Sequence, residues 1–156
     1  MKITLQYLKK HHACDNATAW FLSQHEKDLF ILFKRLAGEG KPLEWGNWLL
    51  SKKLCKLNKI RYAVFAAEQV LPLFTQKYPD DDRPVAAIEA AKNYIKNPTK
   101  KNADAAAYAA ADAADAAHAA HAAAYAAYAA AHAAHAAAKR EMQIKIINYG
   151  LTLLKR

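Results

Sequence analysis

Glycine and cysteine are scarce in this chain of 156 residues, which contains four glycines and two cysteines. None of the glycines falls in a GxxxxGK or GxGxxG pattern, so the sequence lacks the glycine-rich loops that hold phosphate in many nucleotide-binding folds. Two cysteines are too few for a disulfide framework, and their spacing is not that of metal ligands. We therefore expect Cys14 and Cys55 to be reduced thiols in a cytoplasmic protein.

Long apolar runs and strand-like alternation are also missing. No stretch reaches the roughly 18 consecutive apolar residues that a membrane span requires, because Asp, His or Tyr interrupts the Ala-rich segment every few residues. Alternating runs of β-branched residues are absent as well. The sequence therefore predicts an all-α protein with no membrane partner.

The signatures of common enzymes do not occur in the chain. A GxSxG nucleophile elbow and an HExxH zinc motif are both absent. Cys14 lies near His11 and His12, but catalytic Cys and His residues are usually distant in sequence, so a buried thiol is the simpler interpretation. The carboxylates of Asp80, Asp81 and Asp82 are explained by helix capping and a solvated turn. We predict a protein that is not an enzyme, has no cofactor and works by binding.

Short helices are expected over residues 1–98, because apolar residues recur at helical spacing between Gly, Pro and Asp residues that mark turns. Pro72 should kink the longest of these helices or start a new turn. Asp82 is a good N-cap, and Pro84 falls near the first turn of the helix that follows, where its missing N–H costs nothing. The expected segments are about 3–12, a helix capped by Asp15 or Asn16, 28–37, 43–54, 57–77 and 85–96.

Alanine dominates the chain from about residue 99, with 26 alanines and no Gly or Pro between residues 101 and 140. Alanine has the highest helix propensity, so this segment predicts a long helix or a helical hairpin. An amphipathic C-terminal helix should follow, with Ile144, Ile147 and Leu151 on one face. We expect one all-helical domain over residues 1–156, in which short helices (1–98) form a bundle with the Ala-rich and C-terminal helices (99–156).

Histidines and tyrosines form a stripe on the Ala-rich segment. Their spacings alternate between three and four residues, which keeps them on one face of a helix. The stripe has two interpretations: its rings and imidazoles bind a ligand, or they fill gaps between Ala-lined helices. The histidine pairs lack an obvious third ligand, so we predict no metal site. The stripe consists of His118, His121, Tyr125, Tyr128, His132 and His135.

Positive charge is in excess, with a formal net charge of +9. Residues 1–98 carry about two-thirds of this excess, and the tail 139–156 is basic again. Such a balance favours an anionic partner, namely a nucleic acid, a nucleotide or an acidic protein surface, although excess lysine also simply keeps a helical protein soluble. The basic tail contains no DNA- or RNA-binding motif, so we expect no nucleic-acid partner.

Several elements, taken in order, resemble the alanine-rich helical family of Imm-5-like putative immunity proteins, which occur in bacteria and in phage genomes. The most specific parts are Asp82-Arg83-Pro84, which opens DRPVAAIEAA, and Gly46-Asn47-Trp48, which opens GNWLL. The resemblance covers most of the chain and ends in the Ala-rich tract. Its further elements are His12-Ala13-Cys14, Ala17 with Trp20-Phe21, Trp45, and Val70-Leu71-Pro72-Leu73-Phe74.

The resemblance implies an inhibitor that acts by binding and not by catalysis. We favour an anti-defence protein that sequesters a small anionic nucleotide signal; if a phage encodes it, it acts in the host cytoplasm. The alternative is an immunity protein that docks directly on a bacterial toxin or effector, and a structural protein built on the long helix is a third class. We expect the nucleotide in a pocket between the Ala-rich helix and the N-terminal helices, or across a dimer interface where two stripes meet. A long Ala-rich helix favours self-association, and we predict a dimer. The predicted ligand-binding residues are Trp48, Arg83, His118, His121, Tyr125 and Tyr128.

Overall fold

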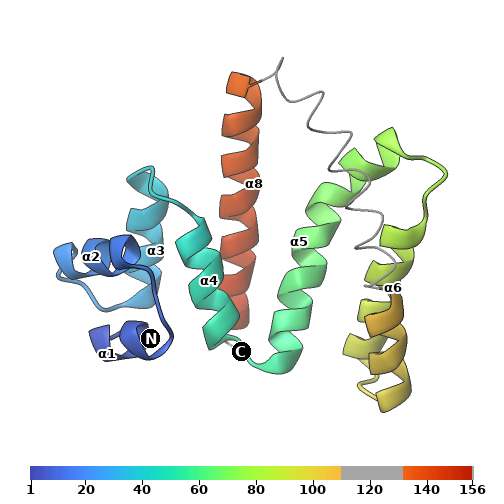
Figure 1. Ribbon diagram of the computed structural model, residues 1–156, viewed down its shortest axis with the longest axis horizontal. Helices are drawn as coiled ribbons and strands as arrows, with labels where there is room; N and C mark the ends of the chain where they lie inside the picture. The colour runs from blue at the N-terminus through green and yellow to red at the C-terminus, as the bar shows by residue number, and fades with distance from the viewer. Residues whose placement is uncertain (110–131, 156) are drawn as a thin grey trace. The chain divides into compact units, whose positions relative to one another are not determined.

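The computed structural model describes residues 1–109 and 132–155, and over these ranges the chain is helical and contains no strand (Figure 1). An isolated antiparallel bridge joins Lys2 to Asp28. The all-α prediction is therefore confirmed. Contacts divide the chain into two units: unit 1 comprises Met1–Leu54 and Gln143–Arg156, and unit 2 comprises Cys55–Met142. The expectation of a single domain stays a prediction.

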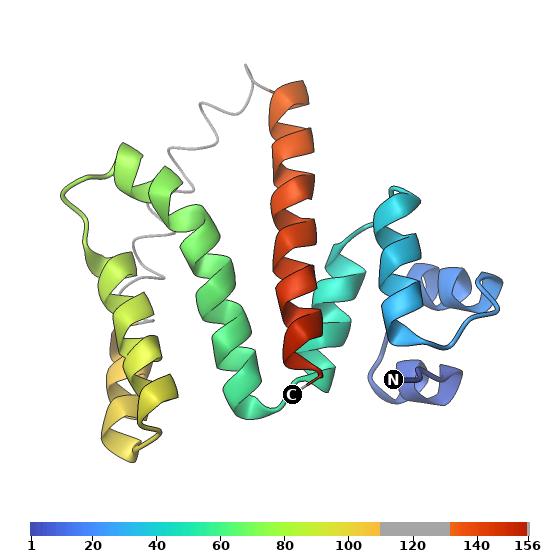
Figure 2. The same ribbon diagram turned by 180° about the vertical axis from the view of Figure 1, so that it is seen from behind.

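Unit 1 brings the two ends of the chain together. In Figures 1 and 2 the last turns of α8 lie beside α4. A hydrogen bond of 3.2 Å from Gln143 Nε2 of α8 to Glu44 Oε1 of α4 links these two helices. The helices of unit 1 are α1 (Leu5–Lys10), α2 (Asp15–Ser23), α3 (Leu29–Gly38), α4 (Glu44–Lys53) and the last part of α8 (His132–Leu153).

Side-chain caps fix the starts of two helices in unit 1. Thr4 Oγ1 accepts a hydrogen bond from the Tyr7 N–H at the start of α1, and Asp28 Oδ1 accepts from the Phe30 N–H at the start of α3. The start of α3 at Asp28 agrees with the sequence prediction. For α2 the predicted cap was wrong, because Cys14 holds the N-cap position. Asp15 is instead the first helical residue, where its negative charge interacts favourably with the positive end of the helix dipole.

The core of unit 1 consists of apolar side chains from all of its helices. Ile147 is buried there, whereas Ile144 and Leu151 of the same predicted apolar face are half-buried. The buried residues of α8 lie about a hundred positions after those of α3 and α4 in the sequence. The C-terminal helix therefore completes the core of unit 1. The buried apolar residues are Ile3, Leu8, Phe21, Leu29, Leu32, Phe33, Leu36, Leu43, Leu50, Leu54, Ile147 and Leu153.

Unit 2 is built on the contact between α5 (Lys56–Lys77) and α6 (Arg83–Lys96). Val64 of α5 and Ile88 of α6 are buried, and Lys92 Nζ lies 2.6 Å from Glu68 Oε1. The α5 helix runs through Pro72 without a new helix start. At the start of α6 the N-cap is Asp82, as expected, but its side chain makes no capping hydrogen bond.

The described ends of the Ala-rich tract are helical. Residues 100–109 form a helix after Pro98, and residues 132–140 are the first part of α8. The end of the tract and the expected C-terminal helix are therefore one continuous helix, because no Gly or Pro separates them before Gly150. The predictions that concern residues 110–131 lie outside the described residues.

Candidate functional site

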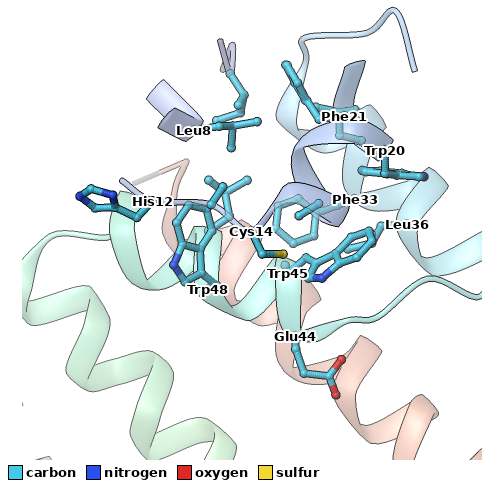
Figure 3. A pocket seen from close by; sticks show the side chains of 16 residues that line it. Leu8, His12, Cys14, Trp20, Phe21, Phe33, Leu36, Glu44, Trp45 and Trp48 are labelled. Carbon is cyan, nitrogen blue, oxygen red and sulfur yellow. The ribbon is translucent and has the colours of Figure 1, made fainter. Parts of the chain in front are cut away.

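A cavity of about 330 Å³ lies within unit 1 (Figure 3). Its volume falls within the range of roughly 300–1,000 Å³ that is usual for small-molecule sites. Residues from α1 to α4 and the adjoining loops line it, and most of them are apolar. Among the buried members of this lining are Leu8, Phe21, Phe33 and Leu36.

All three tryptophans of the chain line this cavity. Trp20 is held in place, because its Nε1–H donates a hydrogen bond of 2.8 Å to Glu39 Oε2. Trp20 and Trp45 contact each other with ring centroids 6.2 Å apart and an interplanar angle of 47°. Such a tilted arrangement suits the quadrupoles of aromatic rings. Trp48, one of the predicted ligand-binding residues, is half-buried on the α4 side of the cavity.

Three polar side chains also line the cavity, namely His12, Cys14 and Glu44. In Figure 3 His12 and Glu44 lie on different sides of it, His12 near Trp48 and Glu44 near Trp45. His12 has a positive φ of 57°, with which the chain turns after α1 toward α2. Cys14 is exposed, so the expectation of a buried thiol was wrong. The reason is its place at the N-cap of α2, where the helix begins at the surface.

Basic side chains gather around His11 and His12. We call Lys10, His11, His12, Lys52 and Lys53 the basic cluster. Lys53 Nζ lies 3.6 Å from the centroid of the Tyr7 ring, which is a cation–π contact. The Tyr7 ring in turn lies 4.3 Å from the His11 ring. Burial lowers the pKa of His11, and the charges of Lys10, Lys52, Lys53 and His12 lower it further. The cluster therefore has the positive field that an anion requires.

Arg83 lies in unit 2, at the start of α6, and forms a bidentate ion pair. Its Nε donates to Asp81 Oδ1 at 2.9 Å and its Nη2 donates to Asp81 Oδ2 at 2.7 Å. This guanidinium lowers the pKa of the Asp81 carboxyl. Much of the Arg83 charge is thus matched by its own turn, which weakens the argument for it as a ligand-binding residue.

The six predicted ligand-binding residues are distributed over different parts of the chain. Trp48 belongs to unit 1 and Arg83 to unit 2, while His118, His121, Tyr125 and Tyr128 lie outside the described residues. Their assignment stays a prediction. The other cavity residues were missed, although the spacing of Trp45 and Trp48 on one helix was a signal for two of its rings. Trp20 and His12 were missed as site residues because only packing brings them to the same cavity.

The described residues contain neither a group of metal ligands nor a helix that could span a membrane. No three His, Cys, Asp or Glu side chains in the described part of the chain are grouped as metal ligands would be. Within the same residues, no helix has the length and apolar character needed to cross a membrane.

Comparisons with known proteins identify one family. The model of the family described as Imm-5 like putative immunity protein matches residues 52–156. Neither the curated proteins nor the solved structures contain a match to the chain. The matched segment begins in the last turns of α4, so it includes unit 2 and the end of α8 but none of the residues that line the cavity.

Proposed function

Because the chain belongs to the Imm-5-like putative immunity protein family, we propose that it is an immunity protein that binds a toxin or effector protein and neutralises it without catalysing a reaction. The family match, which spans residues 52–156, is the observation that carries this proposal. An immunity protein acts by occupying a surface of its partner. A stable complex of this kind needs about 800 Å² of buried surface on each partner.

The charge of unit 1 supports an acidic partner surface. Unit 1 has 12 Lys and Arg residues and five Asp and Glu residues, so it carries +7 of the net charge of +9. Most of these lysines are exposed, including Lys9, Lys34 and Lys145. Charge complementarity of this kind accelerates association and selects partners more than it adds affinity. We therefore propose that unit 1 steers the protein toward an acidic face of the toxin.

Growth rescue tests the proposal. The protein would be co-expressed with a panel of bacterial toxins that have acidic surfaces, and any rescued toxin would be purified for association kinetics. We expect the triple variant Lys9→Glu, Lys34→Glu and Lys145→Glu to slow association by about tenfold or more at low salt. The matched control makes the same charge change on unit 2, with Lys59→Glu, Lys77→Glu and Lys96→Glu.

Two results would contradict this proposal. If the protein rescued growth from no toxin of the panel, the immunity function would have no protein partner. An equal loss of association rate in the two triple variants would show that unit 1 has no special part in steering. A fold check by circular dichroism on each variant separates these results from simple unfolding.

Sequestration of a small anionic nucleotide is a second candidate function. The observation that favours it is the place of Trp48 in a cavity beside the basic cluster. A thermal-shift panel of cyclic di- and trinucleotides and ADP-ribose derivatives tests it. A ligand at 1,000 times its dissociation constant stabilises by about 4 kcal/mol, which raises Tm by roughly 8–16 °C at this chain length. A shift with one nucleotide class would support sequestration, and a flat panel would leave the toxin as the partner.

A further inference from the structure

We propose that the cavity of unit 1 and the basic cluster beside it form one binding site for a planar aromatic anion. The ring of the ligand enters the cavity, and its carboxylate or phosphate contacts the basic cluster. This proposal does not depend on toxin binding. It extends the second candidate function, because it defines which part of a nucleotide the cavity would accept.

The lining of the cavity explains the ring. Apolar side chains and three tryptophans form most of its walls, and aromatic walls favour flat rings through stacked and edge-to-face contacts. Benzene fills an engineered apolar cavity of about 150 Å³. A cavity of about 330 Å³ therefore has room for one single or fused ring system, but not for a whole dinucleotide.

The anionic group has to stay outside the cavity. None of the described Lys and Arg side chains lines it, and the Nε1–H of Trp20 is already paired with Glu39. A buried charge without a partner is costly, so the anion is expected where cations lie nearest. His12 connects the two halves of the site, since it lines the cavity and is next to His11 in the basic cluster.

Glu44 determines which way round the ligand binds. Glu44 lines the cavity, and its carboxylate accepts a hydrogen bond from Gln143. Figure 3 shows it near Trp45, away from the His12 side. An anion near Glu44 would be repelled, and an anion near His12 would be attracted. The two ends of the cavity thus impose one orientation, with the ring toward Trp45 and the anion toward His12.

The tryptophans make the site measurable in the intact chain. Because all three line the cavity, the indole N–H signals in an NMR titration report on it directly. Two matched pairs of probes serve as ligands: AMP with adenosine, and benzoate with benzamide. We expect the anion of at least one pair to shift the indole signals and to bind about tenfold more tightly than its neutral counterpart. This advantage should shrink at high salt, since the basic cluster is exposed to solvent and screened.

Variants separate the two halves of the site. Lys10→Glu with Lys52→Glu should reduce the affinity of the anion to that of its neutral counterpart. The matched control, Lys27→Glu with Lys34→Glu, changes two exposed lysines of unit 1 outside the cluster and should keep the advantage. Ala17→Phe places a ring in the cavity and should abolish binding of every probe. The lysine variants keep the test decisive if Ala17→Phe does not fold.

The outcomes distinguish this proposal from the proposed functions. Binding of benzoate but not AMP would retain the site and remove nucleotide sequestration, and binding of AMP alone would assign the anion as a phosphate. Equal affinity for charged and neutral probes would overturn the proposal and leave a neutral ring, such as a partner side chain, as the occupant. Unchanged indole signals with all four probes would overturn it as well, as would an equal loss in both double-lysine variants.

Discussion

Gly46 shows at the residue scale how closely the helices of unit 1 approach one another. It is buried on α4, and a Cβ at this position would lie 2.7 Å from Phe33 Cε1 and 3.2 Å from Ile147 Cδ1. These two neighbours belong to α3 and α8, so three helices meet at a position that has no side chain. The sequence pattern GNWLL contains this glycine, and the structure supplies the packing reason for it.

Replacement of Gly46 by alanine should therefore destabilise unit 1. The new methyl group forces the Phe33 ring to move, and overpacking of this kind costs about 1–3 kcal/mol. Urea denaturation would measure the free energy of unfolding. Gly38→Ala is the matched control, because nothing lies within 4 Å of a Cβ added at Gly38, which is the last residue of α3. Alanine there should be neutral or stabilise by up to about 1 kcal/mol, and similar losses at both sites would refute the packing argument.

His11 is the residue whose ionisation reports on the basic cluster. Burial lowers its pKa, and Lys10 and then Lys52 lower it further. We expect the pKa of His11, measured by NMR titration, to rise in Lys52→Gln. An unchanged value in this variant would show that Lys52 does not act on the cluster.

The same shift predicts a pH dependence of stability. The unfolded chain should protonate His11 near the usual value of about 6.5, whereas the folded chain protonates it at lower pH. The unfolded state thus binds more protons below about pH 6.5, and stability falls as the pH drops from there toward the folded pKa.

At the scale of the helical element, the main irregularity is Pro72, which lies inside α5. Within α5 its ring leaves one position without a backbone donor, yet the helix continues to Lys77. The Thr75 Oγ1–H, which donates to Leu71 O and Pro72 O, supports the carbonyls of this last turn. Leu73 is 63% exposed and Val70 is 45% exposed. These two apolar side chains therefore add little burial to the turn.

Pro72→Ala should raise the Tm of the protein. A proline inside a helix costs about 3 kcal/mol of stability. Because Pro72 lies near the end of α5, its replacement by alanine should raise the free energy of unfolding by about 1–3 kcal/mol. Gln76→Ala in the same turn is the control, since it changes an exposed side chain and leaves the backbone donors intact. A Tm that falls or stays constant in Pro72→Ala would mean that the proline shape is required for packing.

At the scale of the whole molecule, the charge is unequally shared between the two units. Unit 1 carries +7 and unit 2 carries the remaining +2. The family match falls mostly on unit 2, and the cavity lies in unit 1. The segment that shows the family and the candidate ligand site are therefore separate parts of the chain, and they can be altered independently by mutation.

Self-association is the prediction that belongs to this scale. Alanine offers little side-chain area to bury, so a second copy is the simplest way to stabilise a helix of the composition that the tract has. We expect sedimentation velocity to show a dimer whose fraction rises with concentration. A monomer at high concentration would contradict this prediction and would favour packing of the tract within one chain.

Local sequence determined the helices themselves. Asp28 is the N-cap of α3, and Asn97, which precedes Pro98, is the C-cap of α6. The spacing of apolar residues predicted both ends of α5 to within one residue. Helix formation depends on propensity, capping and periodicity, all of which act over a few neighbouring residues. The all-α class could therefore be predicted without a structure, whereas the family resemblance depended on particular motifs such as DRPVAAIEAA and GNWLL.

Only the tertiary structure decided where these helices meet. Ile147 lies about a hundred residues after Phe33 and Gly46, yet the side chains of Phe33 and Ile147 both reach the place where a Cβ on Gly46 would lie. The cavity likewise joins His12, Trp20 and Trp48 from separate elements. Contacts of this kind depend on the fit of whole faces against one another, and no local pattern specifies that fit. Trp48 was predicted as a ligand-binding residue from the sequence and lines the cavity, but the cavity around it is a product of packing.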